Sequence, residues 1–424
     1  MYLYFIVLLG IIYKFAIIEK ALLEVKNMTS LERFIRYVRI DTQASDKTGT
    51  TPSTEKQKNL GLLLVKELLE LGLEDAHMDE FGVVYAHLPG KGTRIGFNAH
   101  MDTALEVTGE NVKPHLIKSY KGGTIKLANG LEMTPKQFPI LKEHVGHDLV
   151  VTDGNTLLGA DDKAGIAIIM SALQYFKNNP KVPHNTICVA FTVDEEIGEG
   201  PKHFNYREMN AKYAYTIDGS RINTIEAENF NAFAAKVEIT GVSIHPGEAK
   251  GKLINALLLA NEYVSLLPAQ ETPFDSEGKE GYWHLNEITG DSEHATLRFI
   301  LRDFKDEGME QRKETMKAAV KALQEKYPNA KVEISFKEQY RNMKKYVAKK
   351  PIAVKRVRTL MRKNGIEPVT GAIRGGTDGA TFSRNGLITP NLGTGSYNHH
   401  GRYEFLDLDE FNKMISIVIR LMRK

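Results

Sequence analysis

Apolar and polar positions alternate along most of the chain with the two spacings that are typical of helices and strands. In residues 54–71 apolar side chains return every three or four positions, and Gly72 follows, which predicts a helix that ends there. The segment 103–150 is punctuated by Gly and Pro and is predicted to be a long loop with short hairpins. The pattern predicts helices at 54–71 and 163–176 and strands at 83–88, 94–99, 186–192 and 213–217. Because strands alternate with helices, we expect an α/β fold with a mostly parallel central sheet.

The order of elements changes in the middle of the chain. The pattern there predicts strands at 232–239, 282–289, 294–302 and 331–339 and helices at 254–267 and 308–327. This β-α-β-β-α-β order is that of a ferredoxin-like unit. The alternation of the first part resumes at residue 351. We therefore expect a large domain, residues 28–231 and 340–424, into which a small domain, residues 232–339, is inserted.

Charge and cysteine content exclude several classes of protein. The 424 residues include 56 Lys and Arg against 53 Asp and Glu, a formal net charge of only +3. This balance argues against a dedicated nucleic-acid binder and against a polybasic membrane binder. The single cysteine, Cys188, excludes intrachain disulfides and cysteine-based zinc clusters. One free cysteine is typical of a reducing compartment, so we expect a cytoplasmic protein.

The first 27 residues do not follow the pattern of the rest. Residues 2–13 carry no charge, but as a helix they would span only about 18 Å, short of a bilayer core of about 30 Å. Met28 is followed by Thr29 and, three positions later, Glu32, a capping-box pattern that predicts the start of the first helix. We interpret residues 1–27 as an extension outside the fold that results from a misassigned start codon. A genuine N-terminal anchor is the alternative.

Histidines and carboxylates gather in five short segments beside predicted turns. These segments are His100-Met-Asp102, Asp161-Asp162, Asp194-Glu195-Glu196, Asp218-Gly219 and His399-His400. Each alone has an ordinary explanation as a turn, a helix cap or a solvated loop. Three of them directly follow strands, and in an open α/β sheet ligands bind at the carboxyl ends of the strands. Together they offer the nitrogen and oxygen ligands that zinc accepts when thiolates are missing.

These motifs resemble those of the di-zinc aminoacylase/carboxypeptidase superfamily of metallopeptidases, and within it those of the tripeptide aminopeptidases. The similarity runs from about Met28 to the end of the chain. It rests on Asn98-Ala-His-Met-Asp-Thr103, Leu158-Gly-Ala-Asp-Asp-Lys-Ala-Gly165, Phe191-Thr-Val-Asp-Glu-Glu-Ile-Gly198, Tyr215-Thr-Ile-Asp-Gly219, Ser243-Ile-His-Pro-Gly-Glu-Ala-Lys-Gly251, Arg374-Gly-Gly-Thr-Asp-Gly-Ala380 and Tyr397-Asn-His-His-Gly401. The resemblance implies a hydrolase that releases the N-terminal residue of tripeptides.

The resemblance also implies a role for individual residues of the large domain. It assigns the ligands of two Zn²⁺ to His100, Asp161, Glu196, Asp218 and His400. Asp161 would bridge the two ions, with His100 and Asp218 on the first and Glu196 and His400 on the second. Asp102 would orient the His100 imidazole through its other nitrogen, and Glu195 would be the general base and acid. His399 is the weaker choice for the last ligand, because the family places its histidine immediately before the glycine.

In related enzymes the small domain is a lid and dimerisation domain that supplies a histidine to an active site, in some dimers that of the partner subunit. His245 matches that histidine, and a homodimer through this domain is the implied assembly. A cation is also needed for the C-terminal carboxylate of the peptide, and an arginine suits it better than a lysine. Arg302 and Arg374 are both candidates, although either could form an ordinary surface ion pair.

Two other functions are compatible with parts of this reasoning. Another amide hydrolase of the superfamily, such as a dipeptidase, deacetylase or carboxypeptidase, would use the same metal centre. An inactive peptide-binding protein is the alternative from a different class, and it predicts the loss of a ligand or of the base. Every expected position is filled in this sequence. We therefore expect a zinc aminopeptidase acting on tripeptides, without nucleic-acid partners or stable membrane association.

Overall fold

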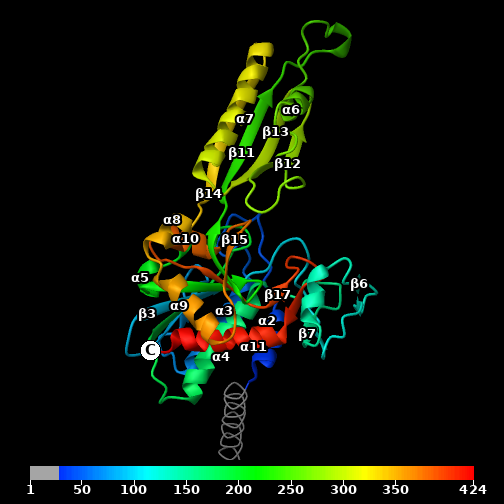
Figure 1. Ribbon diagram of the computed structural model, residues 1–424. Helices are drawn as coiled ribbons and strands as arrows, with labels where there is room; N and C mark the ends of the chain where they lie inside the picture. The colour runs from blue at the N-terminus through cyan, green and yellow to red at the C-terminus, as the bar shows by residue number, and fades with distance from the viewer. Residues whose placement is uncertain (1–27) are drawn as a thin grey trace, which may run out of the picture. The chain divides into compact units, whose positions relative to one another are not determined.

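The computed structural model describes residues 28–424, and its chain divides into two compact units (Figure 1). The first unit comprises the chain up to Glu226 together with Tyr346–Thr370 and Thr377–Lys424. The second comprises Ala227–Lys345 and Gly371–Gly376. The expected extension, residues 1–27, lies outside the described residues. Within residues 28–424 no helix is both long enough and apolar enough to cross a membrane.

An eight-stranded sheet forms the centre of the first unit. Its order is β1 (His77–Met78), β2 (Val84–Leu88), β8 (Thr186–Thr192), β3 (Arg94–His100), β9 (Tyr213–Gly219), β16 (Asn391–Gly393), β10 (Thr224–Asn229) and β15 (Val369–Ile373). The strands β8, β3, β9 and β16 run parallel, whereas β2 pairs antiparallel with β8. The expected α/β class with a mostly parallel central sheet is therefore confirmed. The carboxyl ends of β8, β3 and β9 meet at one edge, where the motif residues follow.

Helices with apolar faces pack around this sheet. They are α2 (Ser30–Val38), α3 (Gln57–Leu71), α4 (Ala160–Asn178), α5 (Tyr206–Met209), α9 (Ile352–Lys363), α10 (Asp378–Arg384) and α11 (Leu408–Met422). The capping box of Thr29 and Glu32 opens α2. Gly72, at φ 94°, ends α3 in the left-handed conformation that glycine adopts without strain. Helix α4 is almost entirely buried and packs against β3, β9, α2 and α11, so its first turn is held firmly at the sheet edge.

The segment predicted as a long loop contributes to a second sheet of the first unit. This sheet has the order β17 (Ser396–Tyr397), β18 (Phe405–Asp407), β7 (Leu149–Val151) and β4 (His115–Ile117), and β5 (Ile125–Lys126) pairs with β6 (Glu132–Met133) nearby in sequence. A separate hydrophobic core supports it, in which Met133, Leu141 and Phe405 are fully buried. The sheet brings the loop around residues 398–404 next to the segment before α4, two regions that are far apart in sequence.

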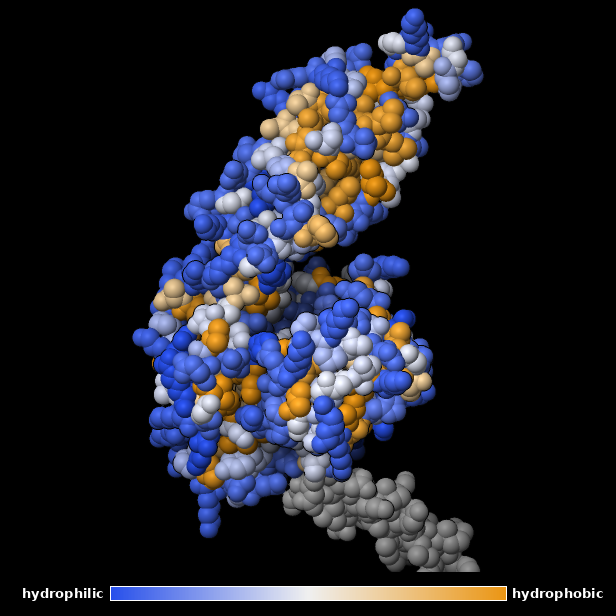
Figure 2. All heavy atoms as spheres, turned by 45° about the vertical axis from the view of Figure 1, so that its right-hand side comes forward, coloured by the Kyte–Doolittle hydropathy of each residue, from blue (hydrophilic) through white to orange (hydrophobic). Residues whose placement is uncertain are grey.

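The second unit is a four-stranded antiparallel sheet with two helices. Its strands lie in the order β12 (Tyr282–Gly290), β13 (His294–Asp303), β11 (Asn231–Thr240) and β14 (Lys331–Tyr340), with α6 (Ala256–Ser265) and α7 (Asp306–Lys326) packed against them. The element order along the chain is the predicted β-α-β-β-α-β. Figure 2 shows hydrophobic residues gathered on one face of this unit. Residues Leu257, Leu258, Leu266 and Phe274, on α6 and after it, are among its exposed apolar side chains.

Candidate metal centre

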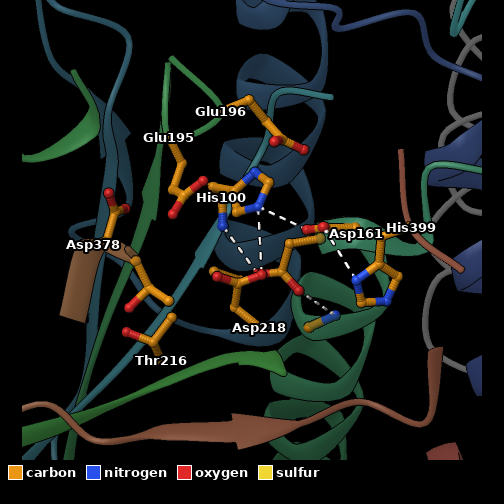
Figure 3. A network of polar contacts seen from close by, with 12 residues as sticks. His100, Asp161, Glu195, Glu196, Thr216, Asp218, Asp378 and His399 are labelled. Atoms are coloured by element: carbon orange, nitrogen blue, oxygen red, sulfur yellow. Dashed lines mark hydrogen bonds and ion pairs between the residues drawn. The ribbon is translucent and has the colours of Figure 1, made fainter. Parts of the chain in front are cut away.

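Three of the predicted ligands meet at the carboxyl edge of the central sheet. His100 ends β3, Asp218 lies near the end of β9, and Asp161 lies in the first turn of α4. His100 Nε2 is 3.0 Å from Asp161 Oδ1 and 3.5 Å from Asp218 Oδ1 (Figure 3). These three atoms come from different elements and still lie within 4.8 Å of one another. They therefore form one group that could hold a metal ion.

A second such group shares Asp161 with the first. The other oxygen of Asp161, Oδ2, is 3.3 Å from His400 Nε2, which is 3.0 Å from Glu196 Oε2. Asp161 thus presents one oxygen to each group. Glu196 follows β8, whereas His400 lies in the loop between β17 and β18 and adopts φ 60°, an unusual conformation for a residue other than glycine. Unusual backbone conformations of this kind cluster at functional sites.

The charges of these groups favour a bound cation. Burial, followed by repulsion from Asp161, raises the pKa of both Glu196 and Asp218 to about 7. Burial alone would lower the pKa of His400, but its bonds to Asp161 and Glu196 raise it to about 12. Glu196 Oε1 is buried and has no hydrogen-bond partner among the described residues. A divalent cation with nitrogen and oxygen ligands would compensate the clustered carboxylates and satisfy this orphaned oxygen, so the residues fit such an ion.

A third group of possible ligands has a different geometry. His144 Nδ1 is 2.6 Å and His147 Nδ1 is 2.5 Å from the same Asp407 Oδ2. Two ligands of one tetrahedral zinc lie about 3.3 Å apart, because each bond is about 2.0–2.1 Å long. The spacing in this third group is that of hydrogen bonds, and the two imidazoles therefore act as donors to Asp407. The first two groups have the wider spacing that metal ligands need.

Asp102 links the two groups in a way that the sequence did not predict. Its main-chain oxygen is 3.2 Å from His100 Nδ1, and its carboxylate oxygen Oδ1 is 3.4 Å from the same nitrogen. The carboxylate instead accepts the main-chain N–H groups of Glu195 and Glu196, each at 3.1 Å. The His100 nitrogen thus faces both the carbonyl and the carboxylate of Asp102. The buried carboxylate holds the turn that carries the predicted base and the predicted ligand.

Glu195 lies beside His100, outside both ligand groups (Figure 3). Burial raises the pKa of its carboxyl group well above the ordinary value, and the nearby charge of His100 opposes this shift. The preceding Asp194 adopts φ 59° and accepts hydrogen bonds from Ser53 and Gln57, so it fixes the turn. A carboxylate with a raised pKa next to a metal site can accept and return a proton.

Both histidines of the pair at 399–400 contact Asp161. His399 Nδ1 is 3.4 Å from Asp161 Oδ2, and its Nε2 is 2.8 Å from the hydroxyl oxygen of Ser396. His400 Nε2 contacts Asp161 Oδ2 and also Glu196, and it alone of the two is a member of a ligand group. The geometry therefore favours His400 as the ligand and gives His399 a hydrogen-bonding role.

Sequence reasoning missed three buried acids that hold this site. Glu404 Oε2 accepts the N–H groups of Leu158 and Gly159, both at 2.7 Å, and its Oε1 accepts that of Asp161 at 3.0 Å. Asp162 accepts the N–H of His100 at 3.1 Å. No local pattern marks Glu404, whereas Asp162 lies in the Asp161-Asp162 segment, in which the sequence assigns a role only to Asp161.

The third missed acid is Asp378, which the motif beginning at Arg374 contains. Its Oδ2 accepts a bond from the Thr192 hydroxyl, and burial raises its pKa to about 7. Its other oxygen is buried without a hydrogen-bond partner in the part of the chain that the structure describes. Figure 3 places its side chain near Glu195, on whose pKa its charge acts. The motif that begins at Arg374 is the sequence signal for this acid, although the resemblance implies a role only for its arginine.

The remaining predicted residues, His245, Arg302 and Arg374, belong to the second unit. The exposed His245 accepts the N–H of Gly247 at 3.1 Å. Arg302 donates to Gln339 at 3.0 Å and to the main-chain oxygen of Leu301.

Arg374 has a structural role that the sequence did not predict. It donates to the main-chain oxygens of Ser276, Gly278 and Glu280 and lies over the rings of Phe230 and Tyr282. These contacts occupy the guanidinium group and hold the loop before β12. Of the two arginines, Arg302 therefore has the more available guanidinium group.

Comparisons with known proteins agree with this fold and site. Residues 147–424 match the model of "Peptidase family M20/M25/M40", which covers more than half of the chain. The chain therefore belongs to this family of metal-dependent peptidases. The resemblance inferred from the motifs is confirmed at this level, and so is the expectation of a metallopeptidase.

Within the family, the chain groups with peptidase T. Peptidase T of Desulfitobacterium hafniense (strain Y51) is 47% identical over 398 residues, which cover 92% of this chain and 97% of the relative. An aminopeptidase of Bacillus cereus has the same fold with a TM-score of 0.71 at 23% identity, covering 93% of this chain and 97% of its own. A tripeptidase of Staphylococcus aureus has a TM-score of 0.74 at 22% identity, covering 93% and 96%.

Proposed function

We propose that this metallopeptidase is a di-zinc aminopeptidase that releases the N-terminal residue of tripeptides. The observation that carries the proposal is the pair of ligand groups that share Asp161 through separate oxygens. His100 and Asp218 would hold one Zn²⁺, and Glu196 and His400 the other. When bound, the two ions supply Lewis acidity to the scissile carbonyl and to a water molecule.

The chain's own residues do the proton chemistry in this proposal. Glu195, which is free of both ligand groups, takes a proton from the attacking water and returns it to the leaving amine. Asp102 keeps Glu195 at a fixed place relative to the ligand Glu196, because it binds both of their N–H groups.

The substrate class rests on the peptidase T relatives and on the charges of a tripeptide. A peptidase that measures length must recognise both ends of a short peptide. We propose Arg302 as the receptor of the C-terminal carboxylate and His245 as a group that contacts the reacting carbonyl. The exposed apolar residues of the second unit, such as Leu258 and Phe274, support a homodimer through that unit. A cytoplasmic location is supported by the single, buried Cys188.

One experiment tests the activity. Zinc-loaded protein is incubated with di-, tri- and tetrapeptides that have free or blocked N-termini, and the products are identified by mass spectrometry. We expect rapid release of the first residue from tripeptides with a free N-terminus only. Preferential cleavage of blocked peptides would indicate a deacetylase or carboxypeptidase, and cleavage of dipeptides alone would indicate a dipeptidase. Either result would overturn the tripeptidase proposal, and failure to cleave any peptide would support a binding protein.

A further inference from the structure

A basic cavity of about 770 Å³ lies in the first unit. Its lining includes six cationic side chains: Lys212, Lys355, Arg356, Arg420, Arg423 and Lys424. It includes no Asp or Glu side chain. We propose that this cavity binds a small molecule that carries several phosphate groups. The ligand is either a free oligophosphate or a nucleotide, because both present the same linked phosphates.

Within residues 28–424, the cations of the cavity are not paired with carboxylate side chains. None of the six forms an ion pair with an Asp or Glu side chain of residues 28–424. Arg356 is anchored, since it donates to the main-chain oxygens of Leu421 and Arg423 at 3.0 and 2.6 Å, while its buried Nε has no hydrogen-bond partner among the described residues. Like charges that surround one cavity repel each other. An anion bound among them would offset this repulsion by its attraction to the cations.

The cavity lies at the opposite edge of the sheet from the metal centre. Thr93 and Tyr213, which line it, stand at the amino ends of β3 and β9, whereas His100 and Asp218 lie towards the carboxyl ends of the same strands. Strand β3 is seven residues long, which corresponds to about 23 Å at about 3.3 Å per residue. A ligand in the cavity is therefore separate from the peptide at the metal centre, and the proposal does not depend on the proposed activity.

The size and chemistry of the lining select the class of ligand. A volume of about 770 Å³ lies within the range of small-molecule sites, about 300–1,000 Å³. Arginine forks bind phosphate oxygens in pairs, and one phosphate group would engage only a few of the six cations. Tyr213, Ile352 and Leu360 add an apolar part of the lining, against which the base of a nucleotide could pack.

Isothermal titration calorimetry with inorganic tripolyphosphate and with ATP, each added to the full-length zinc-loaded protein, tests the proposal. Lys355→Ala/Arg420→Ala removes two exposed cations of the cavity and leaves the anchored Arg356 in place. Lys136→Ala/Lys142→Ala is the matched control, because it removes two exposed charges of the same unit that do not line the cavity. We expect the cavity variant to bind about tenfold more weakly and the control to bind as the parent does.

The same titrations separate the two sources of phosphate. Equal affinity for both probes would support a free oligophosphate, whereas tighter binding of ATP would support a nucleotide. Undetectable binding, or binding that the cavity variant retains, would overturn the proposal, because the second result would place the anion outside the cavity. Equal weakening in both variants would also overturn it, since that indicates only the loss of net charge. Thermal unfolding at the parent Tm shows that each variant is folded, independently of any peptidase activity.

Discussion

Glu404 offers a sharp test of how the metal centre is held in place. Its carboxylate is buried and accepts three main-chain N–H groups, those of Leu158, Gly159 and Asp161. In Glu404→Gln the side chain has one acceptor oxygen. If that oxygen keeps the two bonds of Oε2, the N–H of Asp161 faces an NH₂ group instead. Asp161, which presents one oxygen to each ligand group, then loses the hydrogen bond that holds its main chain to Glu404.

The magnitude follows from the bonds that are lost. A hydrogen bond to a charged group contributes about 1.5–3 kcal/mol, and a buried N–H without a partner costs about 1–3 kcal/mol. We expect the free energy of unfolding of the metal-free protein to fall by about 2–4 kcal/mol. Because residues that orient metal ligands change metal affinity by about 10–100-fold, we also expect zinc to bind more weakly by that factor. Thermal unfolding after treatment with a chelator measures the first effect, and competition with a chromogenic chelator measures the second.

Glu67→Gln is the matched control. Glu67 is a buried glutamate of the same unit whose hydrogen-bond partners are Arg33, Arg36 and Tyr37. This variant also loses stability, because it leaves the buried Arg33 short of negative charge. It should bind zinc as the parent does. If Glu404→Gln is less stable but binds both ions with unchanged affinity, then Glu404 supports the fold alone and the reasoning is refuted.

Three further predictions concern the base, the substrate and pH. Glu195→Gln should retain both zinc ions by elemental analysis but lower kcat by about 10²–10⁴-fold or more, and near-normal turnover would exclude Glu195 as the base. Arg302→Ala should lower kcat/KM for free tripeptides by about 10–150-fold through KM and hardly affect tripeptide amides; equal losses on both would exclude Arg302 as the carboxylate receptor. Burial raises the pKa of Glu196 and Asp218 to about 7 without metal, so the metal-free fold loses stability as pH rises from their unfolded values towards 7. The increase in Tm on adding zinc should therefore be larger at pH 8 than at pH 5, and a pH-independent increase would contradict this.

The elements that the sequence predicts well are those with a strong local signal. The apolar periodicity of α3 and its terminal Gly72 predict that helix, although it begins at Gln57 because Ser53 and Thr54 bond to Asp194 and Gln43. The alternating strands of the second unit likewise predict its element order. The segment 103–150, predicted as a long loop with short hairpins, contains the hairpin of β5 and β6. It also supplies β4 and β7 to a sheet, which local sequence does not predict because β18, the other partner of β7, is far away in sequence.

The residues of the candidate site also differ in whether a local sequence pattern reveals them. His100, Glu196 and Asp218 lie in or just after strands, where local patterns reveal them. Glu404 cannot be recognised in this way, because its partners are main-chain N–H groups 243–246 positions earlier in the chain. The structural role of Arg374 also depends on carbonyl groups that fold back from the segment 276–280. Contacts with a distant backbone leave no pattern in the side-chain sequence.

The Asp102 carboxylate accepts hydrogen bonds from the N–H groups of both Glu195 and Glu196. This pair of bonds limits how the enzyme can be redesigned or can evolve. In the proposed mechanism, a backbone shift that moved the ligand Glu196 to suit a larger or smaller ion would carry Glu195, the proposed proton acceptor, with it. The metal preference is therefore coupled to catalytic competence on this side of the site. Substitutions at Asp218 or His400, which lie on separate elements, can adjust the ligand geometry without moving that pair. A search for variants that use a different metal should begin at those two positions.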